Sequence, residues 1–304
     1  MTEPGAGSDV ASISTVATLD SSGDHFVING EKTFITSGMR ADYYTVVART
    51  PCTGDKGSRN EISLIVVERE REGFSRTKLE KMGWHCSDTA TLHFDNVKVP
   101  KENVIGEIGS GFQGLMLNFN SERLMLATQA TAFSQVRPYI FGVFRQRFWC
   151  LSPTVCSLNS LWELLVSHSQ VAFEEARDWA QQRSTFGAPL ISRQVIRHKL
   201  VDMASAIATC RAFLTTTAEK AAAARSASEQ AEVVADICML KNHCTTQMEF
   251  VATNAVQILG GMGFVSGSKS ERIFRETKVQ QIGGGSTEIM KDLAARQLGF
   301  DVPS

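Results

Sequence analysis

The chain has 304 residues, of which 43% are hydrophobic and 21% are charged, and 31 basic residues nearly balance 32 acidic ones. This composition is typical of a globular protein of one or two domains, and the net charge of -1 argues against a protein that binds nucleic acid or an anionic membrane. Because no apolar run is long enough to span a bilayer, no signal-peptide pattern opens the sequence, and the seven cysteines show no disulfide framework, we expect an intracellular protein without a membrane span.

Short runs of β-branched and aromatic residues, separated by turn residues, occupy the first hundred positions. The clearest runs are 25–29, 43–48, 62–67 and 89–94. Their even spacing predicts an antiparallel β-barrel or β-sandwich domain over residues 1–107.

Long segments rich in Ala, Leu and Met, with helical periodicity, replace this pattern after a glycine cluster near residue 108. They predict a helical bundle of the four-helix kind over residues 108–304, and the fold class is therefore α+β. The expected helices cover residues 111–135, 171–182, 192–224, 229–259 and 286–297.

The segment 136–170 differs in composition from the rest of the chain. It holds six aromatic residues in 35, against 18 in the other 269, with no lysine and one acidic residue. When it is removed, the apolar stripe that ends at Phe133 continues at Ala172 and Ala176 in helical phase. We therefore expect an insertion into one long helix, of the kind that an in-frame retained intron would encode. The alternative is a genuine loop, since the entropy cost of closing a loop rises only slowly with its length.

Two glycine-rich segments could bind an anion or a flat ring through backbone N–H groups. They are residues 2–9 and the triple glycine 283–285, which precedes a helix. Either could equally be a simple turn. Glu122 lies in phase with the apolar stripe of the first predicted helix, where burial would raise the pKa of its carboxyl group toward that of a general base. An ion pair with Arg123 is the plainer alternative.

No metal site is expected. Cys238, His243 and Cys244 would point to different faces of a helix, which favours packing over convergent metal ligation.

Taken together, the motifs resemble the acyl-CoA dehydrogenase family of flavoproteins. They occur in the family's order from end to end, and the unmatched interior block is 136–170. The motifs are Thr2-Glu-Pro-Gly-Ala-Gly-Ser-Asp9, Asn29-Gly30 with Lys32, Phe34-Ile-Thr-Ser-Gly38, Arg183-Ser-Thr-Phe-Gly187 with Gln194, Asp202-Met203, Gln257-Ile-Leu-Gly-Gly-Met-Gly263 and Gly285-Ser-Thr-Glu288.

The resemblance implies a helical first domain, a middle β-domain and a C-terminal four-helix bundle, so we expect that this chain begins inside the second of these. It also implies FAD bound between the last two domains and reaching a neighbouring subunit, hence a homodimer or homotetramer. The residues implied to contact FAD within the subunit are Thr2, Gly7, Ser8, Phe34, Ile35, Thr36, Ser286 and Glu288. Those implied to serve the other subunit's FAD are Arg183, Phe186, Gln194, Gln257, Gly260 and Gly261.

The implied reaction is the α,β-dehydrogenation of an acyl-CoA thioester to a trans-2-enoyl-CoA. Many family members carry the base in the glycine-rich loop, where this chain has Gly284, whereas isovaleryl-CoA and long-chain members carry it immediately before an Arg, as in Glu122-Arg123. The resemblance thus assigns the base to Glu122, and the substrate contacts to Ser8, Asn120, Arg123, Gly284 and Gly285.

Electron transfer flavoprotein is the oxidant that the resemblance implies. The expected location is the mitochondrial matrix in a eukaryote and the cytoplasm otherwise. Two alternatives stay open: an inactive fragment or mis-spliced product of the same family, and a flavin oxidase or monooxygenase on the same fold.

Overall fold

The computed structural model describes residues 1–50, 62–112, 115, 123 and 168–300, and the chain divides into two compact units, residues 1–119 and 120–304. The predicted domain limit at residues 107 and 108 stays a prediction. Each unit is described by itself below.

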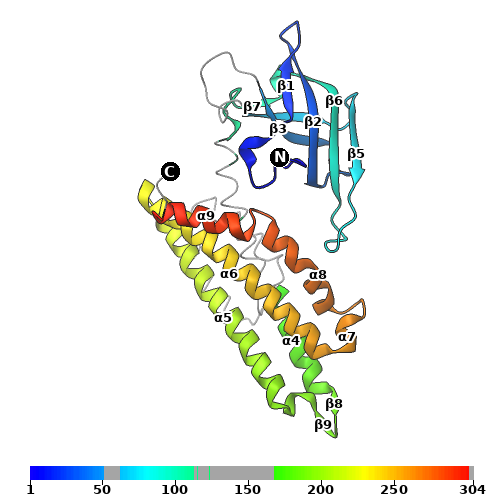
Figure 1. The fold of residues 1–304 in the computed structure, drawn as a ribbon, viewed down its shortest axis with the longest axis vertical. Helices are drawn as coiled ribbons and strands as arrows, with labels where there is room; N and C mark the ends of the chain where they lie inside the picture. Colours follow the sequence, from blue (N-terminus) through cyan, green and yellow to red (C-terminus); the bar gives the residue numbers. More distant parts are fainter. Residues whose placement is uncertain (51–61, 113–114, 116–122, 124–167, 301–304) are drawn as a thin grey trace, which may run out of the picture. The chain divides into compact units, whose positions relative to one another are not determined.

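The first unit is built on one seven-stranded sheet with the order β5-β6-β2-β1-β3-β4-β7 (Figure 1). All four predicted strands are present, and three others were missed. The strands are β1 (Val16–Leu19), β2 (His25–Thr36), β3 (Tyr43–Arg49), β4 (Ile62–Glu68), β5 (Phe74–Lys78), β6 (Thr89–Pro100) and β7 (Val104–Ile105), with short 3-10 helices at Val10–Ser12 and Lys101–Asn103.

The sheet is mixed rather than wholly antiparallel, which corrects the prediction at one pair. Strands β1 and β3 run parallel, with Val16 opposite Arg49. The reason is topological: β3 follows β2 after only six residues and so runs opposite to it, and β1, which lies between them, is antiparallel to β2. Within the described ranges β5 and β7 end the sheet, so it is open and sandwich-like, and the barrel alternative is wrong.

Alternation along the strands gives this sheet its core. In β4, for example, Ile65 and Val67 are fully buried, and in β6 Val97 and Val99 are fully buried. Such side chains on one face pack with Ile28 in a single apolar cluster, as the period of two in a strand requires.

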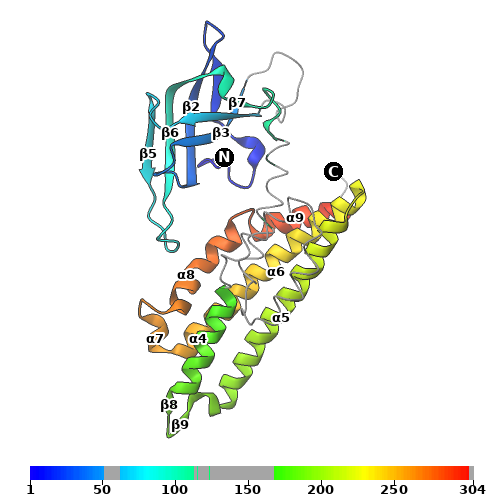
Figure 2. The same cartoon turned by 180° about the vertical axis from the view of Figure 1, so that it is seen from behind.

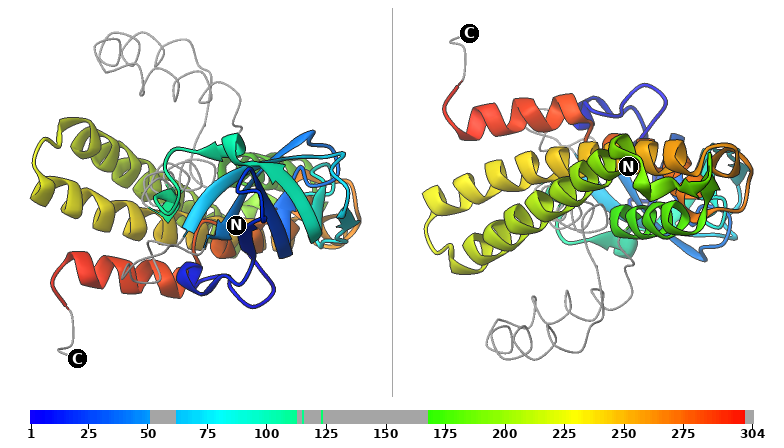
Figure 3. Two further views of the ribbon diagram at one scale, coloured as in Figure 1. Left: turned by 90° about the horizontal axis from the view of Figure 1, so that it is seen from above. Right: turned by 90° about the horizontal axis from the view of Figure 1, so that it is seen from below.

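The second unit is helical, as predicted, and its longest helices run side by side (Figures 1 and 3). Figures 1 and 2 show α8 and α9 following one another along α6. No helix in the described part of the chain is long and apolar enough to cross a membrane. The helices are α4 (His168–Gln182), α5 (Gln194–Ala223), α6 (Ala227–Leu259), α7 (Gly261–Phe264), α8 (Lys269–Ile282) and α9 (Thr287–Gln297).

Helix α8 was not predicted from the sequence, because it is mostly polar and its apolar stripe is short. Its start nevertheless carries a recognisable signal: the Ser268 hydroxyl accepts a hydrogen bond from the Glu271 N–H at 3.1 Å. Helix α6 begins in the same way, with a complete capping box between Ser226 and Glu229.

Helix α4 begins at His168, so the last three residues of the predicted insertion belong to the bundle, and 136–167 lie outside the described residues. Gln170 is buried and accepts a hydrogen bond from Arg211 of α5 at 2.9 Å. The tripeptide Ser-Gln-Val occurs both at 134–136 and at 169–171. Joining Gln135 to Val171 would therefore keep the residue types that α4 uses here.

Candidate functional site

In the first unit the predicted loop 2–9 lies against β2. The Thr33 N–H donates to the Thr2 carbonyl at 2.8 Å. This bond places Thr2 beside the strand that carries Phe34, Ile35 and Thr36, so the structure brings together two segments that the sequence separates by about thirty residues.

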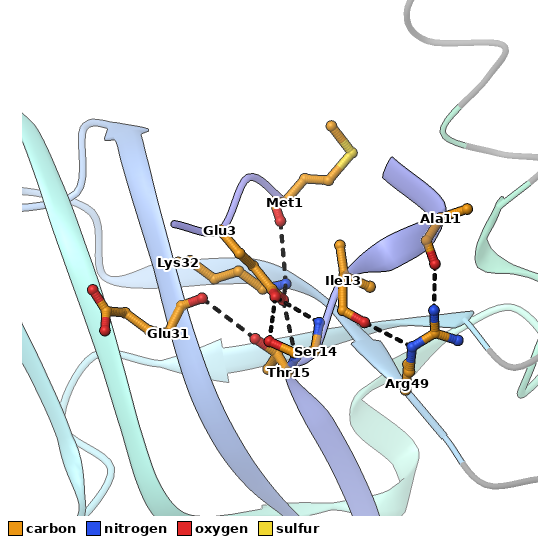
Figure 4. Close-up of polar contacts among 9 residues, drawn as sticks. All are labelled: Met1, Glu3, Ala11, Ile13, Ser14, Thr15, Glu31, Lys32 and Arg49. Carbon is orange, nitrogen blue, oxygen red and sulfur yellow. Dashed lines mark hydrogen bonds and ion pairs between the residues drawn. The ribbon is translucent and has the colours of Figure 1, made fainter. Parts of the chain in front are cut away.

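A buried ion pair fixes this loop (Figure 4). The Lys32 Nζ lies 2.6 Å from Glu3 Oε1 and donates to the Met1 carbonyl at 3.1 Å. Ser14 donates to Glu3 from both its N–H and its hydroxyl, at 2.6 and 2.7 Å, and the Thr15 N–H donates at 3.0 Å. Loop and strand are thus joined by charge-assisted bonds in a site from which water is excluded.

Burial and the ion pair together shift the pKa values of both Glu3 and Lys32. Burial alone would raise the pKa of Glu3, but hydrogen bonds from Lys32, Thr15 and Ser14 outweigh it and lower the pKa to about 2. Burial lowers the pKa of Lys32, and the bond to Glu3 partly offsets this effect. With its pKa at about 2, the Glu3 carboxylate is charged near neutrality. The ion pair was not predicted from the sequence, where Lys32 appears only as part of a motif. The available signal was the position of the two charges, since Glu3 follows Thr2 and Lys32 precedes Phe34.

Phe34 has an unusual conformation. Its φ is +59°, in the left-handed region that bulky residues avoid, and it lies where the β2–β6 register shifts between Lys32 and Ile35. The side chain is 69% exposed within its unit. Strained backbone that displays an aromatic ring is characteristic of ligand sites. Gly7, Ser8 and Thr36 are exposed as well, so hydroxyl donors accompany the ring.

In the second unit the triple glycine forms the turn between α8 and α9. Gly284 and Gly285 have φ of +66° and +102°, which only glycine adopts without strain. Ser286 then caps α9, its hydroxyl accepting from the Ile289 N–H at 3.5 Å, and Glu288 lies in the first turn of that helix.

Two cations hold this turn by its carbonyl groups. Arg123 Nε donates to the Gly284 carbonyl at 3.1 Å. Lys241 of α6 donates from Nζ to the carbonyls of Gln281 and Gly285, each at 2.8 Å. Both side chains are buried. Lys241 was missed from the sequence, although it interrupts an apolar face of α6 in the way that Glu122 interrupts its own predicted helix.

Glu122 and Asn120 lie outside the described residues. The structure does join Arg123, the residue after Glu122, to Gly284. Three of the residues expected near the base and the substrate, Arg123, Gly284 and Gly285, are thus brought together.

Three further predicted cofactor residues lie at the hairpin between α4 and α5, formed by β8 (Ser184–Thr185) and β9 (Ala188–Pro189). Arg183 precedes it and Gln194 begins α5. Phe186 at its tip has a φ of +52° and is 97% exposed, with the Arg193 guanidinium 5.7 Å from its ring centre.

The last three, Gln257, Gly260 and Gly261, lie where α6 ends and α7 begins. A hydrogen bond of 2.8 Å from Lys199 of α5 to Asn254 of α6 shows that the start of α5 and the end of α6 are neighbours. The hairpin and this turn therefore occupy one end of the bundle.

These residues are far from the glycine turn at 283–285. The sixteen residues from Lys241 to Gln257 along α6 correspond to about 24 Å of helix rise. A pocket of about 480 Å³ beside Met262 is lined by the carboxylates of Glu174, Glu175 and Asp178 and by one basic residue, Lys269. The excess of negative charge disfavours a pyrophosphate there.

The cysteines considered as metal ligands are core residues. Cys238 packs with Met290 and Ala294, and Cys244 lies in the main helical core. Among the described residues no group of three His, Cys, Asp or Glu side chains could hold a metal ion.

Two family models match the chain. The acyl-CoA dehydrogenase middle domain matches residues 1–97, and the acyl-CoA dehydrogenase C-terminal domain matches residues 162–299. The second match begins inside the segment 136–170, which shortens the unmatched block from its C-terminal side.

One solved structure and two sequence relatives support these family matches. The crystal structure of an acyl-CoA dehydrogenase from Geobacillus kaustophilus has 35% identity and a TM-score of 0.80, covering 98% of this chain and 67% of its own. The mitochondrial long-chain specific acyl-CoA dehydrogenase of Sus scrofa is 33% identical over 99% of this chain and 60% of its own. The mitochondrial isobutyryl-CoA dehydrogenase of Bos taurus is 32% identical over 98% and 61%.

The chain spans about 60 to 67% of the length of these proteins. Both of its units match, in sequence and in fold, and the chain belongs to the acyl-CoA dehydrogenase family.

Proposed function

We propose that this protein catalyses the α,β-dehydrogenation of an acyl-CoA thioester to a trans-2-enoyl-CoA, with Glu122 as the general base. The observation that carries the proposal is the hydrogen bond from Arg123 to the Gly284 carbonyl, because it links the residue next to Glu122 with the turn assigned to the thioester.

Members of the family are FAD flavoproteins, and the residues of the first unit suit such a cofactor. An exposed Phe34 ring beside the hydroxyls of Ser8 and Thr36 offers an apolar face and hydrogen-bond donors to a flat polar ring. Thr2, Gly7 and Ile35 would complete this side, and Ser286 and Glu288 the side of α9. When bound, FAD would supply the acceptor for the β-hydride.

Proton removal falls to the chain's own residues. The α-proton of a thioester is a weak acid, so the developing charge on the thioester oxygen needs a hydrogen-bond donor. Among the described residues nothing accepts a hydrogen bond from the Gly284 N–H, while its carbonyl is occupied by Arg123. The N–H is therefore available to the thioester oxygen, and Glu122 would take the proton. Ser8, Asn120 and Gly285 would contact the acyl-CoA.

A second subunit would complete the cofactor site. Arg183, Phe186, Gln194, Gln257, Gly260 and Gly261 gather at one end of the bundle, about 24 Å along α6 from Lys241. Such a distance suits residues that serve the FAD of a neighbouring subunit in a homodimer or homotetramer. An Arg guanidinium would pair with the pyrophosphate in a fork.

Electron transfer flavoprotein is the proposed oxidant, and the mitochondrial matrix the proposed site in a eukaryote, or the cytoplasm otherwise. A panel of acyl-CoA substrates with an artificial electron acceptor would measure both the reaction and the acyl preference.

Glu122→Gln tests the central assignment. The variant should keep the visible absorbance of bound FAD and lose roughly 100-fold or more of enoyl-CoA formation, because a general base contributes about that factor. Glu232→Gln, at an exposed position of α6, is the matched control and should retain both. Unchanged turnover in Glu122→Gln would refute its role as the base.

A further inference from the structure

Lys241 is fully buried in the middle of α6, yet it belongs to no group of predicted site residues. Its ammonium donates to the Gln281 and Gly285 carbonyls, both at 2.8 Å. These two carbonyls stand at either side of Gly283 and Gly284, so one side chain holds both ends of the glycine turn.

The environment of Lys241 is costly for a cation. Among the described residues no carboxylate lies within ion-pair distance of it. Burial, and then the nearby charge of Arg123, lower the pKa of Lys241 to about 8, against the opposing influence of Glu288 and Cys238. An apolar side chain of the same length would avoid this desolvation, so overall stability alone does not explain a lysine at this position.

The glycine turn gives a reason for the lysine at position 241. Glycine has more backbone freedom than any other residue, and three in a row would leave the Gly284 N–H without a fixed direction. Two charge-assisted bonds from a rigid helix, together with the bond from Arg123 to the Gly284 carbonyl, restrict that freedom.

We propose that Lys241 is a positioning residue: its ammonium clamps the carbonyls of Gln281 and Gly285 and thereby orients the Gly284 N–H toward the thioester oxygen. The orientation of the turn follows from the contacts above, while its consequence for catalysis rests on the proposed function. The role is separate from that of Glu122, because Lys241 acts through the turn and exchanges no proton with the substrate.

The test compares Lys241→Met with Lys199→Met in the whole chain. Methionine keeps the length of the side chain but has no donor. Lys199 is a matched control because its amine also bridges to a second element, at Asn254, away from the turn. Hydrogen exchange of the peptide covering residues 279–290, the melting temperature, and kcat and KM are measured for each.

We expect exchange in the turn of Lys241→Met to rise by about tenfold or more, since both bonds to a charged donor are lost. The melting temperature should change little, because removing the buried ammonium's desolvation cost offsets the loss of these two bonds. Its kcat should fall by a similar factor while KM changes less than about twofold, as expected for an interaction that matters in the transition state. Lys199→Met should leave exchange in the turn unchanged.

Unaltered exchange in the turn, or faster exchange spread evenly over the unit, would overturn the proposal. If Lys241→Met shows faster exchange in the turn but the parent protein has no dehydrogenase activity, the clamp is upheld and the proposed function is refuted. A fall in kcat of Lys241→Met without a change in exchange would refute the clamp and leave the proposed function standing. Should Lys241→Met fail to fold, Lys241→Gln, which has a shorter and uncharged donor, is subject to the same criteria.

Discussion

Replacing Lys32 by methionine should destabilise the first unit strongly. The change removes the ammonium from Glu3 and leaves a carboxylate that is only 3% exposed. Breaking one side of a buried ion pair costs on the order of 3–5 kcal/mol. Because Ser14 and Thr15 continue to donate three hydrogen bonds to Glu3, we expect the lower end, about 3 kcal/mol in the free energy of unfolding.

Native-state hydrogen exchange of β2 amides, combined with urea denaturation, measures this loss within the first unit. Lys78→Met is the matched control, because Lys78 pairs with Glu80 at 3.3 Å while 61% of its side chain is exposed. An exposed pair contributes about 0 to 1 kcal/mol. In the double variant of Lys32→Met and Glu3→Gln the two charges are gone, so its cost should be well below the sum of the single costs.

Two outcomes would contradict this reasoning: a cost in Lys32→Met no larger than in Lys78→Met, or strict additivity in the double variant. The loop 2–9 carries Thr2, Gly7 and Ser8, so we also expect Lys32→Met to retain less FAD after purification. Full retention of FAD would show that the loop keeps its place without the ion pair.

Three more predictions follow from individual contacts. The folded pKa of Glu3 lies at about 2, below its ordinary value of 4.5, so its stabilising contribution should be complete above pH 4.5 and disappear as the pH falls toward 2. Urea denaturation at a series of pH values should show the free energy of unfolding falling over this range, and Glu3→Gln should lack the fall. Gly263→Ala should destabilise the bundle by about 1–3 kcal/mol, because the new Cβ would lie 2.5 Å from the Val256 carbonyl oxygen, whereas Gly261→Ala, with nothing within 4 Å, should melt nearly as the parent does. Deleting residues 136–170 should raise the melting temperature of the helical unit, since closing a 35-residue loop costs about 3 kcal/mol; a lower melting temperature would show that the segment supports the fold, as a genuine loop.

The elements that the sequence predicted are those with strong local patterns. Strands β2, β3, β4 and β6 consist of β-branched and aromatic runs, and α5 and α6 have long apolar stripes. The missed strands β5 and β7 end the sheet, where one side is unpaired and polar residues are tolerated, so alternation is weak. Helix α8 was missed because its sequence is polar, although Ser268 and Glu271 marked its start.

The contacts of the candidate site depend on long-range pairing, which no local pattern encodes. Arg123 meets Gly284 across 161 positions, and Lys241 meets Gly285 across 44. The motifs named the glycines of the turn, but the two cations that hold it belong to other helical segments. The one local clue is a charged residue on the apolar face of a helix. It identifies a candidate site residue but does not identify the group that the residue contacts.

Both units hold a candidate site loop in place with a buried lysine. Lys32 and Lys241 are the largest fully buried side chains in the described part of the chain. Lys32 donates to Glu3 in the glycine-containing loop 2–9, and Lys241 donates to Gly285 in the glycine turn. Glycine gives these loops the shape to approach a ligand but raises the entropy that ordering must overcome, and a charged donor on a rigid element offsets that cost. The two lysines differ in their counterions. Because Lys32 has a carboxylate partner and Lys241 only carbonyls, methionine should destabilise the protein at the first position and loosen only the turn at the second.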